Sequence, residues 1–146
     1  METIKIKKLN NLAKIPTFGT AFSAGADLYA ATDYNIEILP HETVKIDTGL
    51  AMAIPAGYFG GIFARSGLAT KQGLRPANCV GVVDADYRGP VIVALHNDTN
   101  ETQVVAAGSR IAQMIIMKCP DISYEEVEDL DNTERGAGGF GSTGTN

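Results

Sequence analysis

Short alternations of apolar and polar residues recur along the chain, and each is typical of a β-strand with one buried face. They predict strands at residues 3–8, 34–39 and 43–47, and further runs fit strands at residues 50–54, 58–64, 78–83, 91–96, 102–105 and 110–118. Only residues 66–71 and 124–130 have a pattern that would fit a helix. This series of short strands in a chain with 16 glycines predicts one all-β domain, a sandwich or a barrel.

A polar turn separates two of these predicted strands. Residues 78–83 and 91–95 are rich in β-branched and apolar side chains, and between them lie Asp84, Tyr87 and Arg88. The pattern predicts a β-hairpin with charged and aromatic groups at its tip. Taken alone, the cluster is more simply read as a solvated turn, because Asp and Gly are ordinary turn residues.

Length and charge narrow the class of protein. The chain has 146 residues, which favours a single domain. Its formal charge is -5, with 17 acidic and 12 basic residues, which argues against a nucleic-acid or membrane surface as partner. A polyanionic substrate would therefore need local arginines or a metal ion. The amino terminus lacks the apolar run of a signal peptide, so we expect a cytoplasmic or nuclear protein that is not secreted.

The inventory of reactive side chains excludes several chemistries. Cys79 and Cys119 form no CxxC pattern, and we expect both to be small core residues in a reducing compartment. His41 and His96 are the only histidines and have no zinc-ligand spacing. Ser66 has no nearby histidine to activate it. Carboxylates, arginines, hydroxyls and glycine backbone remain, and this set suits phosphoryl transfer to water.

The composition changes after residue 124. Residues 125–132 are acidic, and the chain then becomes rich in Gly, Ser and Thr. Such a segment cannot bury enough apolar surface to order itself, which predicts a β-domain over residues 1–132 and a flexible tail over 133–146. The glycines of 136–141 match the dinucleotide-binding pattern, but no strand precedes them and no helix follows, so we reject that function.

Five short motifs occur in order along the chain. They are Ala24-Gly25-Ala26-Asp27-Leu28, Ala64-Arg65-Ser66-Gly67-Leu68-Ala69, the segment 78–89, Gly108-Ser109-Arg110-Ile111-Ala112-Gln113 and the segment 135–144. Together they resemble the motifs of the trimeric dUTPase family. The resemblance implies a jelly-roll-like β-barrel and a homotrimer whose sites are shared between subunits. The implied activity is hydrolysis of dUTP to dUMP and pyrophosphate, which limits uracil incorporation into DNA and supplies dUMP for thymidylate synthesis.

The same resemblance assigns roles around the nucleoside. Asp84 would hold the 3'-hydroxyl and activate the attacking water as a general base. Tyr87 would stack beneath the deoxyribose and leave no room for a 2'-hydroxyl. Uracil would be bound by Asn78 and by backbone groups of the hairpin, including Gly81. Asp27 would hold Mg²⁺ through water, which agrees with the tendency of that ion to keep several waters.

The remaining implied roles concern the triphosphate. The residues expected to contact the α- and β-phosphates are Arg65, Ser66, Gly67 and Gln113. The tail residues expected to close over the γ-phosphate and the base are Arg135, Phe140, Gly141, Ser142 and Thr143, with the Phe140 ring stacked on uracil. Ser109 departs from the family pattern, which usually has Asp there. For Asp86 and Arg110 we expect a salt bridge or a subunit contact.

Two other functions fit the same fold. A dCTP deaminase would need a catalytic Glu on the strand after the hairpin, and Ala94 stands at that position. A third possibility is a nucleotide-sensing or capsid-like β-domain without catalysis. The combination of Asp84, Arg65 and Arg135 disfavours a site without activity.

Overall fold

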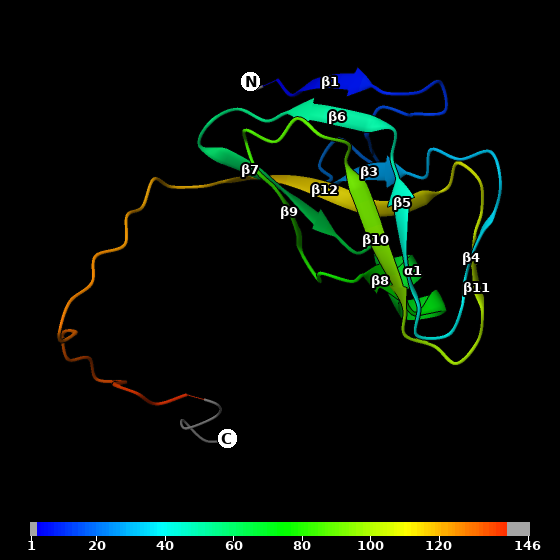
Figure 1. Ribbon diagram of the computed structural model, residues 1–146. Coiled ribbons are helices and arrows are strands. Elements are labelled where there is room, and N and C mark those ends of the chain that lie inside the picture. Colours follow the sequence, from blue (N-terminus) through cyan, green and yellow to red (C-terminus); the bar gives the residue numbers. More distant parts are fainter. Residues whose placement is uncertain (1–2, 140–146) are drawn as a thin grey trace.

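The computed structural model describes residues 3–139 and shows an all-β architecture (Figure 1). Its twelve strands are β1 (Lys5–Lys8), β2 (Thr17–Phe18), β3 (Ala26–Tyr29), β4 (Ile36–Ile38), β5 (Thr43–Asp47), β6 (Leu50–Ala53), β7 (Tyr58–Phe63), β8 (Leu74–Pro76), β9 (Gly81–Val83), β10 (Ile92–Asn97), β11 (Gln103–Val105) and β12 (Arg110–Lys118). A single helix, α1 (Ser66–Gln72), was found in this part of the chain, between β7 and β8. The predicted all-β class and the helix are confirmed.

The strands form four sheets. The largest has the order β2-β3-β12-β7-β9, a second has the order β5-β10-β8, and the pairs β1-β6 and β11-β4 complete the set. All pairings are antiparallel. No sheet within residues 3–139 closes on itself, so the predicted barrel closure is not confirmed.

Strand β12 is the centre of the largest sheet. It pairs with β3 on one side and β7 on the other, so Gln113 lies opposite both Asp27 and Phe63. Ile111, Ala112 and Met114 of β12 are buried in the core, and the two adjacent buried residues coincide with a shift of register against β3. The fully buried side chains around them include Leu28, Ile38, Ile46, Leu50, Leu74, Val93 and Leu95. Burial of each such side chain contributes about 1.5 to 3 kcal/mol, so this core fixes the position of the residues on β12.

The predicted hairpin after residue 78 is wrong. β9 pairs with β7 in the largest sheet, whereas β10 pairs with β5 and β8 in the second sheet. The segment 84–91 therefore crosses from one sheet to the other. It contains a local turn, in which the Tyr87 N–H donates to the carbonyl of Asp84 at 3.2 Å, but this turn does not join two paired strands. Val91 at the end of this segment likewise bonds to a distant part of the chain, because its N–H donates to the carbonyl of Leu50 at 2.8 Å. The local sequence predicted a strand in both segments, although residues 78–80 form a turn and only Gly81–Val83 of the first are strand. The same pattern contains no information on the partners of a strand.

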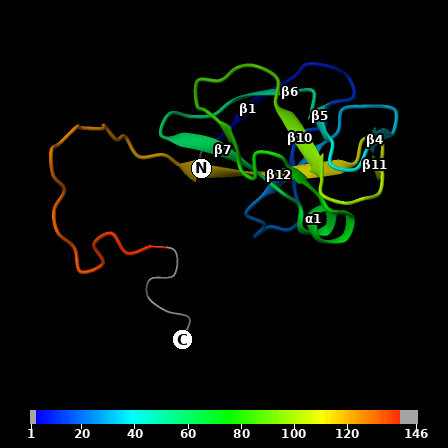
Figure 2. The ribbon, with the colours of Figure 1, turned by 60° about the horizontal axis from the view of Figure 1, so that its bottom comes forward.

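Three further expectations also need correction. β2, β3 and β8 were not predicted, since each is very short and β8 contains a proline. The possible helix at 124–130 is absent, and residues 119–139 form no helix or strand; they run away from the folded body (Figure 1, Figure 2). Cys79 and Cys119 are exposed and are not core residues, because both lie where the chain leaves its sheet. Within residues 3–139 no helix is long and apolar enough to cross a membrane.

Candidate active site

Two pockets contain nine of the predicted site residues. The first, of about 440 Å³, is lined by Asp27, Arg65, Ser66, Gly67 and Gln113, together with Gly19, Ser23, Ala24, Gly25, Arg110 and Ile115. The second, of about 370 Å³, is lined by Asn78, Gly81, Asp84 and Tyr87, together with Ile62, Val82, Val83, Pro90, Val91 and Ile92. The two pockets share no lining residue. The structure thus separates the residues predicted for the phosphates from those predicted for the nucleoside.

The first pocket lies where β3 and β7 meet the central strand β12. Gln113 projects from β12, and its Nε2 donates to the carbonyl of Ala64 at 2.9 Å. Gly25 lies against the same side chain, so a Cβ at position 25 would overlap the Gln113 amide. The absence of a side chain at Gly25 therefore allows Gln113 to occupy the pocket.

Asp27 links two arginines in this pocket. Its Oδ1 accepts from Arg65 Nε at 2.8 Å and its Oδ2 from Arg110 Nη1 at 3.1 Å. The Asp27 side chain is 13% exposed, so these ion pairs are shielded more than ordinary surface pairs. Two cations and one anion leave a net positive charge in the pocket, which suits a polyanion. The expected salt bridge of Arg110 is confirmed.

Backbone donors add to this positive charge at the start of α1. Arg65 is the extended N-cap residue and makes no side-chain cap. The N–H groups of the first helical turn, at Ser66 and Gly67, have no partner within the helix. A Cβ at Gly67 would meet no atom within 4 Å, so the space in front of this turn is open. The turn can therefore donate hydrogen bonds to a phosphate.

The groups that line the first pocket fit a magnesium ion that is held mainly by the phosphates of a bound molecule and by water. No group of three or more His, Cys, Asp or Glu side chains that could hold a metal occurs among residues 3–139. Among the described residues that line the first pocket, Asp27 is the only one with a carboxylate. A carboxylate offers about four acceptor positions, and the two arginines use two of them. The others can accept from metal-bound waters, and Mg²⁺ often binds through one carboxylate together with substrate phosphates.

The second pocket places a free amide beside a strand. Asn78 lies over Gly81, where a Cβ would be 3.1 Å from its Nδ2 and 3.2 Å from the Cβ of Ile62. Gly81 thereby leaves the space that the amide occupies. Within the described chain the Asn78 amide makes no hydrogen bond, so it can both donate to and accept from a ligand.

The loop after β9 is held by its own contacts. Tyr87 Oη donates to the carbonyl of Pro90 at 3.1 Å, and the ring lies against Gly89, where a Cβ would overlap it. The Arg88 guanidinium donates to the carbonyls of Ala85 and Tyr87 at 2.6 and 2.8 Å. Asp84 is exposed at the rim of the pocket. The loop thus presents a carboxylate and a half-exposed phenol ring toward the same space.

Of the predicted tail residues, only Arg135 belongs to the part of the chain that the structure describes, and it lines neither pocket. Arg135 is exposed, and its Nε donates to the carbonyl of Gly138 at 2.9 Å. Phe140, Gly141, Ser142 and Thr143 lie outside the described residues. The sequence indicated no role for Gly25, and for Arg110 only a salt bridge or subunit contact, although both residues stand in the motifs. No sequence signal marks the contribution of Ile62 to the second pocket.

Comparison with known proteins places these pockets in context. The dUTPase family profile matches residues 11–144. The deoxyuridine 5'-triphosphate nucleotidohydrolase of Desulfitobacterium hafniense is 46% identical over 99% of this chain and 99% of its own length. The enzyme of the same name from Rickettsia felis is 49% identical over 97% of this chain and 96% of its own.

Solved structures agree with this result. The dUTPase of Staphylococcus bacteriophage 80alpha with dUpNHpp superposes with a TM-score of 0.86, at 28% identity, over 99% of this chain and 100% of that one. The dUTPase of phage phi11 of S. aureus, described with a structural Mg(II) ion, shares the fold with a TM-score of 0.81, at 23% identity over 90% of this chain and 100% of that one.

Proposed function

The chain belongs to the dUTPase family, and we propose that it hydrolyses dUTP to dUMP and pyrophosphate by attack of water on the α-phosphate. The observation that supports this reaction most strongly is the difference between the two pockets. One combines two arginines with free backbone N–H groups, as a triphosphate requires. The other combines a neutral amide, a phenol and an exposed carboxylate, as a deoxyuridine requires.

We assign the chemistry in the second pocket to Asp84. Its carboxylate would accept a hydrogen bond from the 3'-hydroxyl and take a proton from the attacking water. A positioned general base increases the reaction rate about 100- to 10,000-fold. The Tyr87 ring, held by its bond to Pro90, would lie beneath the sugar and exclude a 2'-hydroxyl. Asn78 and the backbone at Gly81 would bind uracil.

The residues of the first pocket would hold the triphosphate. Arg65, anchored at Nε by Asp27, keeps its terminal nitrogens for the α- and β-phosphates, and Ser66, Gly67 and Gln113 add neutral donors. Mg²⁺ bound to the phosphates would neutralise charge that develops on the leaving pyrophosphate. Asp27 would accept hydrogen bonds from the waters of that ion and so orient it.

We propose that the protein forms a homotrimer with active sites shared between subunits. We also propose that each subunit has the architecture of a jelly-roll-like barrel. The two pockets of one chain have no residue in common, so a second copy can complete each of them. Cyclic symmetry would then generate equivalent sites from one small domain. Residues 133–146, with Arg135 and Phe140, would close over the nucleotide and exclude bulk water. The product dUMP would supply thymidylate synthesis, and removal of dUTP would limit uracil in DNA.

One assay tests the reaction and its rival together. The protein is incubated with dUTP, dCTP, dTTP or UTP in the presence of Mg²⁺, and pyrophosphate is resolved from ammonia. We expect pyrophosphate from dUTP alone. We expect no ammonia, because Ala94 offers no acid for deamination and the residue opposite it on β5 is Lys45. Ammonia from dCTP, or equal turnover of all four nucleotides, would refute the proposed activity.

A further inference from the structure

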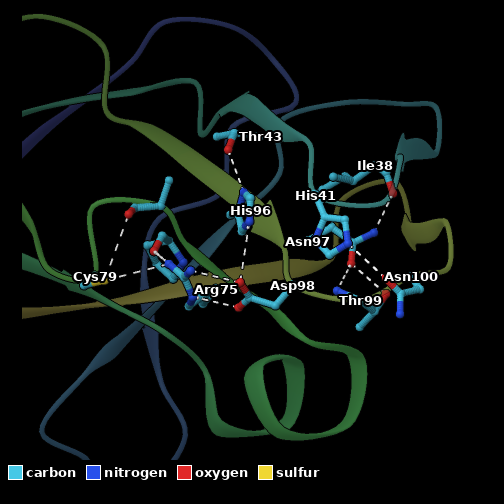
Figure 3. A network of polar contacts seen from close by, with 12 residues as sticks. Ile38, His41, Thr43, Arg75, Cys79, His96, Asn97, Asp98, Thr99 and Asn100 are labelled. Carbon is cyan, nitrogen blue, oxygen red and sulfur yellow. Dashed lines mark hydrogen bonds and ion pairs between the residues drawn. The ribbon is translucent and has the colours of Figure 1, made fainter.

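A polar network lies outside both pockets, where β5, β8 and β10 run side by side (Figure 3). Arg75 on β8 donates to Asp98 twice, from Nε at 2.7 Å and from Nη2 at 2.9 Å. His96 on β10 has its Nε2 3.5 Å from the same carboxylate and its Nδ1 2.9 Å from Thr43 Oγ1. The hydrogen bond with Asp98 raises the pKa of the Arg75 guanidinium above its ordinary value. The fork between Arg75 and Asp98 is thus supported on its far side by β5 and β10.

The Arg75 nitrogen that does not bond to Asp98, Nη1, points toward the turn that carries Asn78. Arg75 Nη1 lies 3.4 Å from the carbonyl of Pro76 and 3.8 Å from Cys79 Sγ, as Figure 3 shows for the contact with Cys79. The carbonyl of Pro76 also accepts the N–H of Cys79 at 3.1 Å, which closes the turn. One guanidinium therefore joins both ends of the turn to the second sheet.

This turn needs such support because its backbone is strained. Cys79 has φ of 58°, a left-handed conformation that non-glycine residues rarely adopt. A residue in this region costs free energy and persists only where surrounding contacts fix it. The side chain of Cys79 is exposed, so core packing does not supply those contacts. Within the described chain the turn is held by backbone bonds, among them the bond from the Ala77 N–H to the carbonyl of Ala94 at 2.8 Å, and by contacts of Cys79 with Pro76, Ala77 and Arg75. Of these, Arg75 provides the charged side chain that reaches Cys79 from the second sheet.

We propose that Arg75 and Asp98 are positioning residues that hold the Asn78 turn in place and thereby set the selectivity for uracil over cytosine. The inference rests on the proposed function of the second pocket. Uracil presents a donor at N3 and an acceptor at O4, whereas cytosine presents the reverse at the corresponding atoms. An Asn amide can match either pattern by turning over, so it discriminates only when its orientation is fixed. Gly81 provides the surface against which Asn78 rests, and Arg75, held by Asp98, contacts the turn at Pro76 and Cys79.

Base selectivity should depend on Arg75 and Asp98, whereas sugar selectivity should not. Tyr87 stands on the loop 84–91, which is held by Arg88 and Pro90 and makes no bond with Arg75 or Asp98. Arg75→Met and Asp98→Asn should therefore lower the ratio of kcat/KM for dUTP over dCTP by about 10- to 100-fold, the range expected for a displacement on the order of 1 Å. The ratio for dUTP over UTP should stay unchanged. The loss should appear mainly as a higher KM for dUTP.

Controls make the result specific. Lys45→Met removes a cation from exposed β5 and should alter neither ratio. Arg75→Lys keeps the charge but loses the fork, so it should fall between wild type and Arg75→Met. The double variant of Arg75 and Asp98 should be no worse than either single variant, because both act through one contact.

The outcomes are distinguishable. A folded Arg75→Met or Arg75→Lys enzyme with wild-type base selectivity would overturn the inference. Parallel loss of both ratios, with a lower Tm, would also overturn it and assign the pair a purely structural role. A wild-type enzyme that does not discriminate dUTP from dCTP would instead refute the proposed function of the second pocket.

Discussion

The Gln113 side-chain amide lies against Gly25, in space that a Cβ at position 25 would occupy. Gly25→Ala should therefore move Gln113 out of the first pocket. Because a displacement on the order of 1 Å can cost about 100-fold, kcat/KM for dUTP should fall by about 10- to 100-fold. Thermal unfolding should change little, since the amide is the mobile end of a flexible side chain. Steady-state kinetics and Tm measure both effects.

A double-mutant cycle identifies the cause of that loss. If Gly25→Ala acts through Gln113, it should have almost no further effect in a Gln113→Ala background. Additive losses in the double variant would show instead that position 25 acts on another part of the pocket.

Asp84→Asn should retain nucleotide binding and lose turnover. The amide keeps the shape of the carboxylate but cannot take a proton, so kcat should fall by about 100- to 10,000-fold. Titration calorimetry with a non-hydrolysable dUTP analogue checks that binding survives. Asp86→Asn is the matched control, because Asp86 is also exposed on this loop but does not line the pocket. Near-wild-type kcat in Asp84→Asn would remove this residue from the role of base.

Tyr87 should control the choice of sugar. Tyr87→Ala should relax the rejection of UTP more than the rejection of dCTP, because the ring and the base-binding amide are on separate segments. Tyr87→Phe loses only the bond to the carbonyl of Pro90 and should retain most of the selectivity. Equal loss of both selectivities in Tyr87→Ala would indicate collapse of the loop, which circular dichroism and Tm would reveal.

Asp27 should serve both stability and metal use. Asp27→Asn leaves Arg65 and Arg110 without their shared anion, so the free energy of unfolding should fall by about 1 to 3 kcal/mol. The Mg²⁺ concentration for half-maximal activity should rise, since the waters of the ion lose an acceptor. Arg110→Met is the control, because it leaves the pair between Arg65 and Asp27 in place. An unchanged Mg²⁺ requirement in Asp27→Asn would contradict its role toward the metal.

Removal of residues 133–146 should leave the β-fold intact and sharply reduce kcat. The proposed closure by this segment excludes bulk water and adds contacts to the γ-phosphate, and both are lost with it. Phe140→Ala should show part of the effect, through a stacking contribution of about 1 to 3 kcal/mol. Turnover of the shortened enzyme at the rate of the full chain would refute the closure.

The sequence predicted the strands better than it predicted their partners. β5 was expected at residues 43–47 and β12 at 110–118, and both have those bounds. An alternation identified the first and a largely apolar run the second. Two apolar runs on either side of Asp84 suggested a hairpin. Pairing was decided by distant strands, where Gly60 and Gly61 of β7 face Val83 and Val82 of β9. The local sequence does not indicate which distant strand a segment pairs with.

The residues of the candidate site were predictable as motifs, but their spatial division was not. The resemblance named Arg65, Gln113 and Asp84, and the first two share a pocket while the third lies in another. The role of Gly25 depends on a side chain that is distant along the chain. The contact between Arg75 and Asp98 joins β8 to the residue that follows β10 in the same sheet, and neither residue stands in a family motif.

The position of Gln113 on the central strand also has consequences for amide hydrogen exchange. β12 pairs with β3 over Arg110–Met114 and with β7 over Gln113–Lys118, so the amides bonded in these ladders should exchange only when the largest sheet opens. The segment 84–91 has mostly local bonds, and its amides should exchange through smaller openings. The triphosphate would then meet a surface that stays formed as long as the domain is folded, whereas deoxyuridine would meet one that opens and closes independently on a faster timescale.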